Sequence, residues 1–125
     1  MNLADIVAAL KADEALHSLI EDRIYFDKAD INSVPCIAYT FSPITDNRIE
    51  RTDRLTIMSF AIGESKTAKC LEIDSRVRKI LLSYGDTSSV SSILQAYVNG
   101  GSTPVDITPE IKQVTTFYTI ISRSE

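Results

Sequence analysis

PCIAYTFSPI (35–44), TDNRIERTDR (45–54) and LTIMSFAIG (55–63) are three consecutive stretches of this chain, and the contrast between them decides the fold. The outer two contain no charged residue, whereas the middle one holds six charged side chains in ten positions. The outer stretches are rich in β-branched and aromatic residues, which are typical of strands. The pattern therefore predicts a long β-hairpin with a projecting charged tip.

The second strand of this hairpin has two apolar faces. Side chains alternate across a strand, so one face carries Leu55, Ile57, Ser59 and Ala61, and the other carries Thr56, Met58, Phe60 and Ile62. One layer of helices can cover only one face of a sheet. The second face needs either more protein from this chain or another subunit, which is a first indication of oligomerisation.

Helical periodicity lies on both sides of the hairpin. The first helix has Leu3, Ile6, Val7 and Leu10 on one face. The phase is reset at Asp13, which can cap a second short helix whose apolar face is Leu16, Leu19 and Ile20. The longest helix is expected from Lys66 to about Leu82, with an inward stripe of Cys70, Ile73, Val77, Ile80 and Leu81.

The remaining segments are expected to be strands. Residues 23–26 predict a short edge strand, residues 93–98 a second strand and residues 114–121 a closing strand. Residues 99–102 include two glycines and predict a tight hairpin turn with a return arm at residues 104–107. The expected fold is α+β: a mainly antiparallel sheet packed against an N-terminal helical pair and one long helix, with a protruding hairpin arm.

Length and composition indicate one globular domain over residues 1–125. Hydrophobic residues make up 44% and charged residues 24%, which suffices for a packed core. The net charge of -4 arises from the first 34 residues, so sequence-specific DNA binding is disfavoured. The N-terminus lacks a signal-peptide pattern, and no apolar run approaches membrane-spanning length, so we expect cytoplasmic synthesis and no membrane partner.

Residue types that often take part in catalysis or metal binding are present, but they do not form a recognisable sequence motif. His17 is the sole histidine, no serine lies in a Gly-x-Ser-x-Gly elbow, and the paired glycines at 100–101 have no lysine after them. Cys36 and Cys70 are not in a Cys-x-x-Cys pair, so two buried thiols are favoured over a bridge. We expect no catalytic residue, no metal site and no cofactor, and therefore no enzyme.

The charged hairpin tip is the candidate functional element. It holds three acids and three arginines, so its net charge is zero. One interpretation is a solvated loop, and the other is an arm that pairs with a neighbouring copy, because arginine is favoured in contacts between proteins. The candidate subunit-interface residues are Arg48, Ile49, Glu50, Arg51 and Arg54.

Taken together, these features resemble the tail completion or tail terminator family of tailed bacteriophages. The resemblance runs nearly end to end and depends on the order of its pieces. These are the first helix with Ala12, Asp13 and Leu16, the segments 22–25 and 35–39, the charged hairpin, the long helix, and the closing strand with Tyr118.

The resemblance implies a non-enzymatic virion protein that forms a six-membered ring on the tail tube and joins tail to head. Its partners would be further copies of itself, the tail tube protein and head-tail connector proteins, with assembly in the host bacterial cytoplasm. DNA would pass through the ring without specific binding. Two alternatives remain open: another neck component such as a head completion protein, or a small α+β enzyme or ligand-binding domain with a polar pocket near His17 or Tyr39.

Overall fold

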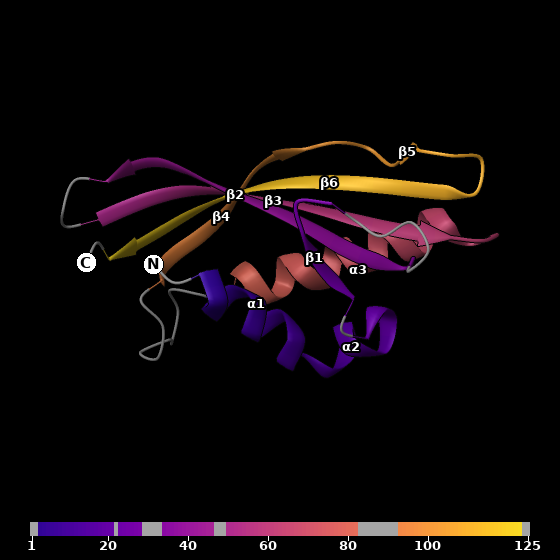
Figure 1. Ribbon diagram of the computed structural model, residues 1–125, viewed down its shortest axis with the longest axis horizontal. Helices are drawn as coiled ribbons and strands as arrows, with labels where there is room; N and C mark the ends of the chain where they lie inside the picture. Colours follow the sequence, from indigo (N-terminus) through magenta and orange to yellow (C-terminus); the bar gives the residue numbers. More distant parts are fainter. Residues whose placement is uncertain (1–2, 22, 29–33, 47–49, 83–92, 124–125) are drawn as a thin grey trace.

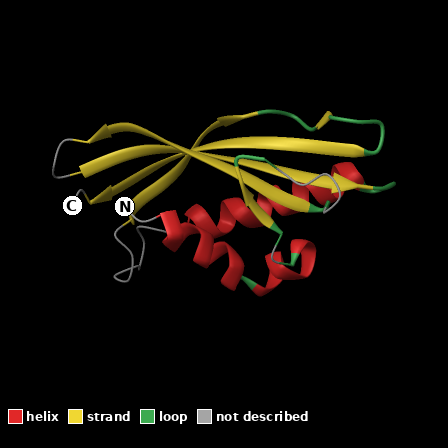
Figure 2. Cartoon of the chain, in the orientation of Figure 1, coloured by secondary structure: helices red, strands yellow, loops and turns green. Residues whose placement is uncertain are grey.

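The computed structural model describes residues 3–21, 23–28, 34–46, 50–82 and 93–123. Its elements follow the predicted order (Figures 1 and 2). They are α1 (Leu3–Ala12), α2 (Glu14–Ile20), β1 (Ile24–Phe26), β2 (Cys36–Asp46), β3 (Glu50–Ile62), α3 (Lys66–Leu82), β4 (Ile93–Gly101), β5 (Val105–Asp106) and β6 (Ile111–Arg123). The predicted α+β fold class is therefore confirmed.

The six strands form one sheet in the order β1-β2-β3-β6-β4, with β5 also paired to β6. β1 runs parallel to β2, and every other pairing is antiparallel. β6 accompanies β3 from the pair Glu50 and Arg123 to the pair Ile62 and Ile111. The predicted hairpin of β2 and β3 thus lies inside the sheet, with β1 on one side and β6 on the other.

All three helices lie on the same side of the sheet (Figure 1). The main core fills the space between the two layers and includes Leu16, Ile37, Ile57, Val77 and Tyr118, all completely or almost completely buried. The alternation predicted for β3 is confirmed, because Leu55, Ile57, Ser59 and Ala61 are buried toward the helices. The inward residues predicted for β6, Val114, Thr116, Tyr118 and Ile120, are buried as well.

Two polar contacts fix the helices in this layer. The Asp13 carboxylate caps α2 by accepting from the Leu16 amide at 2.9 Å, and it also accepts from Arg76 Nε of α3 at 2.7 Å. Deeper in the interface, Thr116 Oγ1 of β6 donates to the buried Asp74 carboxylate of α3 at 2.6 Å. One contact therefore holds α2 to α3, and the other holds α3 to the sheet.

The paired glycines do not form the predicted hairpin turn. β4 and β5 both pair antiparallel with β6, through Gly101 opposite Thr116 and Val105 opposite Gln113, so the chain continues along one edge instead of reversing. The register shifts between Val98 and Gly101. A Cβ on Gly101 would approach the Thr115 carbonyl oxygen to 2.7 Å, so the glycine allows the close approach that a bulge requires. The reversal comes later, at residues 107–111.

Replacing Asp13 tests the contact between α2 and α3. Asp13→Ala removes the cap and the ion pair, so we expect the free energy of unfolding to fall by about 1–2 kcal/mol at neutral pH. Asp13→Asn keeps a capping oxygen and should cost less. Urea unfolding followed by circular dichroism measures both values, and equal stability of all three proteins contradicts the role of Asp13.

The same contact predicts a pH dependence. The Arg76 guanidinium lowers the pKa of Asp13 from 3.8 to about 2. Because the folded-state pKa is the lower one, the contribution of Asp13 is complete above about pH 4 and is lost as the pH falls toward 2. The stability difference between the wild type and Asp13→Asn should therefore shrink over this range, and a constant difference would exclude the ion pair as its source.

Candidate assembly surfaces

The predicted interface residues lie in or next to the first half of β3. Arg48 and Ile49 fall outside the described residues. Glu50 and Arg51 lie in β3, where the backbone of Arg51 pairs with Asp46 of β2 and with Ser122 of β6. The strands thus extend further into the charged stretch than predicted, because β6 provides a second partner for β3 up to its first residue. Whether the tip protrudes as an arm stays a prediction.

Arg54 lies on the face of the sheet opposite the helices. Its strand partners are Ser42 and Thr119, and its guanidinium carbon is 6.0 Å from the centre of the Phe117 ring. A cation over an aromatic ring at such an exposed site contributes about 0.5–1 kcal/mol. Arg54 therefore has a partner within its own chain, which the sequence analysis did not predict.

This helix-free face is defined by the residues whose side chains point away from the helices. Among the residues whose side chains the structure describes, register places on it Cys36, Ala38, Thr40 and Ser42 of β2, Thr52, Arg54, Thr56, Met58, Phe60 and Ile62 of β3, Tyr97 of β4, Val105 of β5, and Ile111, Gln113, Thr115, Phe117, Thr119 and Ile121 of β6. Arg54 is the one charged residue in this set. Tyr97 and Val105 are 41% and 48% exposed, although both are large and apolar.

Part of the helix-free face is buried without help from a helix. Cys36, Ala38, Phe60 and Ile111 form a second cluster, against which Tyr25, Val34 and Met58 pack. Side chains of β1 and of the segment before β2 therefore shield one end of this face. The other end, around Arg54, Tyr97 and Phe117, has no such cover among the described residues.

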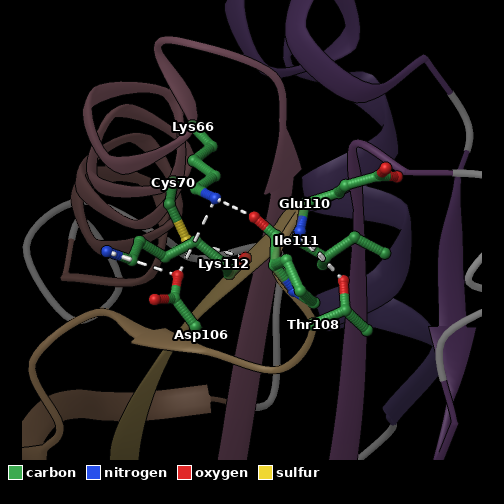
Figure 3. Close-up of polar contacts among 8 residues, drawn as sticks. Lys66, Cys70, Asp106, Thr108, Glu110, Ile111 and Lys112 are labelled. Carbon is green, nitrogen blue, oxygen red and sulfur yellow. Dashed lines mark hydrogen bonds and ion pairs between the residues drawn. The ribbon is translucent and has the colours of Figure 1, made fainter.

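The end of the sheet near the β5–β6 turn is fixed by its own contacts (Figure 3). Lys66, the first residue of α3, donates from Nζ to the Pro109 carbonyl oxygen at 2.6 Å. Asp106 lies 3.5 Å from Lys112 Nζ and 3.9 Å from Lys66 Nζ. The Cys70 thiol donates to the Ser59 carbonyl oxygen at 3.0 Å. The lysine contacts join α3 to the turn, and the Cys70 contact joins α3 to β3.

His17 and Tyr39 are the residues near which a polar pocket was one alternative. His17 is exposed on α2, whereas Tyr39 is half-buried on β2 and packs edge-to-face against Phe26. Two grooves between α2 and α3 are lined by Ser18, Leu19 and Glu72, and include neither His17 nor Tyr39. No three histidine, cysteine, aspartate or glutamate side chains among the described residues could jointly hold a metal ion. Within the same residues, no helix is long and apolar enough to span a membrane.

The prediction of two buried thiols is confirmed. Cys36 and Cys70 are both buried thiols. Burial raises the pKa of the Cys70 thiol to about 11, so this group is neutral at physiological pH. A neutral, buried thiol is a poor nucleophile, since the reactive form is the thiolate. Both cysteines therefore act as core residues.

Comparison with known proteins gives a structural match but no sequence match. No protein-family model and no curated protein sequence matches the chain. A chain in a solved structure described as "Virion of native gene transfer agent (GTA) particle" is similar, with a TM-score of 0.72 and 10% sequence identity. The match covers 95% of this chain and 92% of that chain. At this identity, the likeness shows that the two chains share a fold.

Thiol accessibility tests the burial of both cysteines. We expect the native protein at pH 8 to react with Ellman's reagent at least a hundredfold more slowly than a free thiol, because neither sulfur is exposed. After unfolding in guanidinium chloride, two thiols per chain should react at once. Rapid reaction of one thiol in the native protein would contradict the structure at that cysteine.

Proposed function

We propose that this chain is a structural component of a phage or phage-like virion: a tail terminator or tail completion protein that caps the tail tube as a ring and joins tail to head. The observation that carries the proposal is the shared fold, which extends over nearly the whole of this chain and of a chain from a virion.

The helix-free face supports a role in assembly. Large apolar side chains such as Tyr97 and Val105 remain exposed on it, and exposed apolar surface of this kind is typical of contacts between proteins. In a ring built from head-to-tail contacts, each subunit uses two different surfaces, so a neighbour can cover what the helices leave open. We propose a homohexamer, which contacts the tail tube protein on one side and head-tail connector proteins on the other.

The charge distribution is compatible with a channel for DNA. Proteins that hold DNA do so mainly through lysine and arginine contacts to phosphates. The residues that define the helix-free face include one charged side chain, and Arg54 is engaged with Phe117. A ring with such a surface toward its axis would let DNA pass without retaining it. The function is thus mechanical and requires neither a cofactor nor a catalytic residue.

Imaging of the purified protein tests this proposal. We expect mass photometry to show an assembly of six chains, and negative-stain micrographs of the protein mixed with tail tubes to show rings at tube ends. Rings bound to head connectors but never to tubes would favour a head completion protein. A protein that stays monomeric both alone and with tubes would refute the proposed function.

The charged hairpin gives a second test. Arg48→Glu combined with Arg51→Glu reverses two charges at the candidate interface, so we expect ring assembly to weaken at least tenfold while the fold persists. Lys28→Glu combined with Lys69→Glu is the matched control, because it makes the same change in net charge at exposed positions elsewhere. Light scattering measures assembly, and equal assembly by both variants would exclude a role for the arm.

A further inference from the structure

The sheet has two open edges at the end where β2 finishes and β3 begins, which we call the hairpin end. On one side, β1 pairs only with residues 37–39 of β2, so the part of β2 from Thr40 to Asp46 has no strand beyond it among the described residues. On the other side, β6 is the one strand that pairs with β4 within the described ranges. An open edge exposes backbone N–H and C=O groups that can pair with another chain.

These two edges lie at the same level of the sheet. Val98 of β4 lies opposite Tyr118, Tyr118 lies opposite Leu55, and Leu55 lies opposite Phe41 of β2. The row nearest the tip runs from Ile93 through Ser122 and Arg51 to Asp46. Residues 93–98 on one edge are therefore level with residues 41–46 on the other.

The strand directions also fit. β2, β3, β6 and β4 are antiparallel in succession, so β4 runs opposite to β2. When two copies stand side by side in the same orientation, β4 of one copy meets β2 of the next as an antiparallel neighbour. At the hairpin end, β2 and β3 extend beyond the helices (Figure 1), whereas Ala96 of β4 belongs to the core cluster that includes Ile6 of α1.

The chemistry of the edges supports the same pairing. Monomeric proteins protect edge strands with charged residues, yet β4 has no charged residue along its nine positions. An exposed large apolar residue lies on each edge: Tyr97 on β4 and Ile44, which is 49% exposed, on β2. The Ile37 amide donates to Arg23 and the Tyr39 carbonyl oxygen accepts from Asp27, so the odd-numbered residues of β2 face this edge. Pro43 offers no N–H and a register shift follows it, so the new pairing should centre on Phe41.

We propose that β4 of one copy pairs antiparallel with the open edge of β2 in the next copy, so that the sheet continues from subunit to subunit. The occupant is a second copy of this chain, because the chain supplies both halves of the contact at one level and in the required direction. This inference rests on the proposed ring and assigns its contact to the backbone of two named strands. The contact is head-to-tail, so it can close into a ring.

Disulfide trapping tests the proposed pair. Ser42 and Tyr97 lie on the same row, which runs through Arg54 and Thr119, and both side chains are exposed on the helix-free face. We expect Ser42→Cys combined with Tyr97→Cys to give, on mild oxidation, a ladder of multimers up to six chains on a non-reducing gel. Thr40→Cys combined with Tyr97→Cys covers a register shifted by two residues. The native cysteines are buried and should add little background.

A matched control separates this contact from random collision. Ser42→Cys combined with Glu72→Cys places the second thiol at an exposed position on α3. We expect the edge pairs to give at least tenfold more multimer than this control. Equal yields would overturn the proposal. A Tyr97→Cys single variant that forms at least tenfold more dimer than the control would also overturn it, because that product requires two β4 edges to meet.

Amide hydrogen exchange gives an independent measurement on the unmodified chain. Exchange in residues 40–46 and 93–101 should be at least tenfold slower in the assembled ring than in the dissociated protein. Rings without this protection and without a ladder would overturn the edge pairing while leaving the proposed function standing. Absence of rings, ladder and protection together, with tail tubes present, would overturn both.

Discussion

A single layer of helices shields only one face of this sheet, and most features of the molecule follow from that constraint. The main core lies on the shielded face, where Leu16, Val77 and Tyr118 are completely buried. The buried contact between Asp74 and Thr116 fixes α3 on that face. The helix-free face has no covering layer of helices. A cluster around Phe60 is buried on it, and a region around Phe117 is more exposed.

The sequence alone predicts the elements and their order because hydrophobic periodicity is local. Alternation in residues 55–62 identifies which side chains of β3 point inward, and the i, i+3, i+4 pattern does the same for α3. The cap at Asp13 is also visible, since aspartate before an apolar helical run is a typical N-cap. Its bond to Arg76 could not be predicted, because these residues are 63 positions apart in the chain.

What the sequence does not reveal is register between distant strands. The glycines at 100–101 suit a turn or a bulge equally well, and only the presence of β6 beside them selects the bulge. The length of β3 also depends on β6. Because β6 pairs with β3 as far as Glu50, the strand includes charged residues that the sequence alone assigned to the hairpin tip. Likewise, the equal level of the two open edges depends on three successive registers, from β2 through β3 and β6 to β4.

The position of charge then limits how such sheets can be used. The helix-free face carries Arg54 as its one charged residue in the defined set, whereas the exposed residues of α2 include Glu14 and, just after it, Glu21. If copies join at their edges, one face of the continuous sheet points toward the axis and the other away from it. An almost neutral face toward the axis neither attracts nor repels a polyanion strongly, because long-range attraction to phosphates depends on net positive charge. Backbone pairing at the edges would then supply cohesion between subunits without placing charge along the channel.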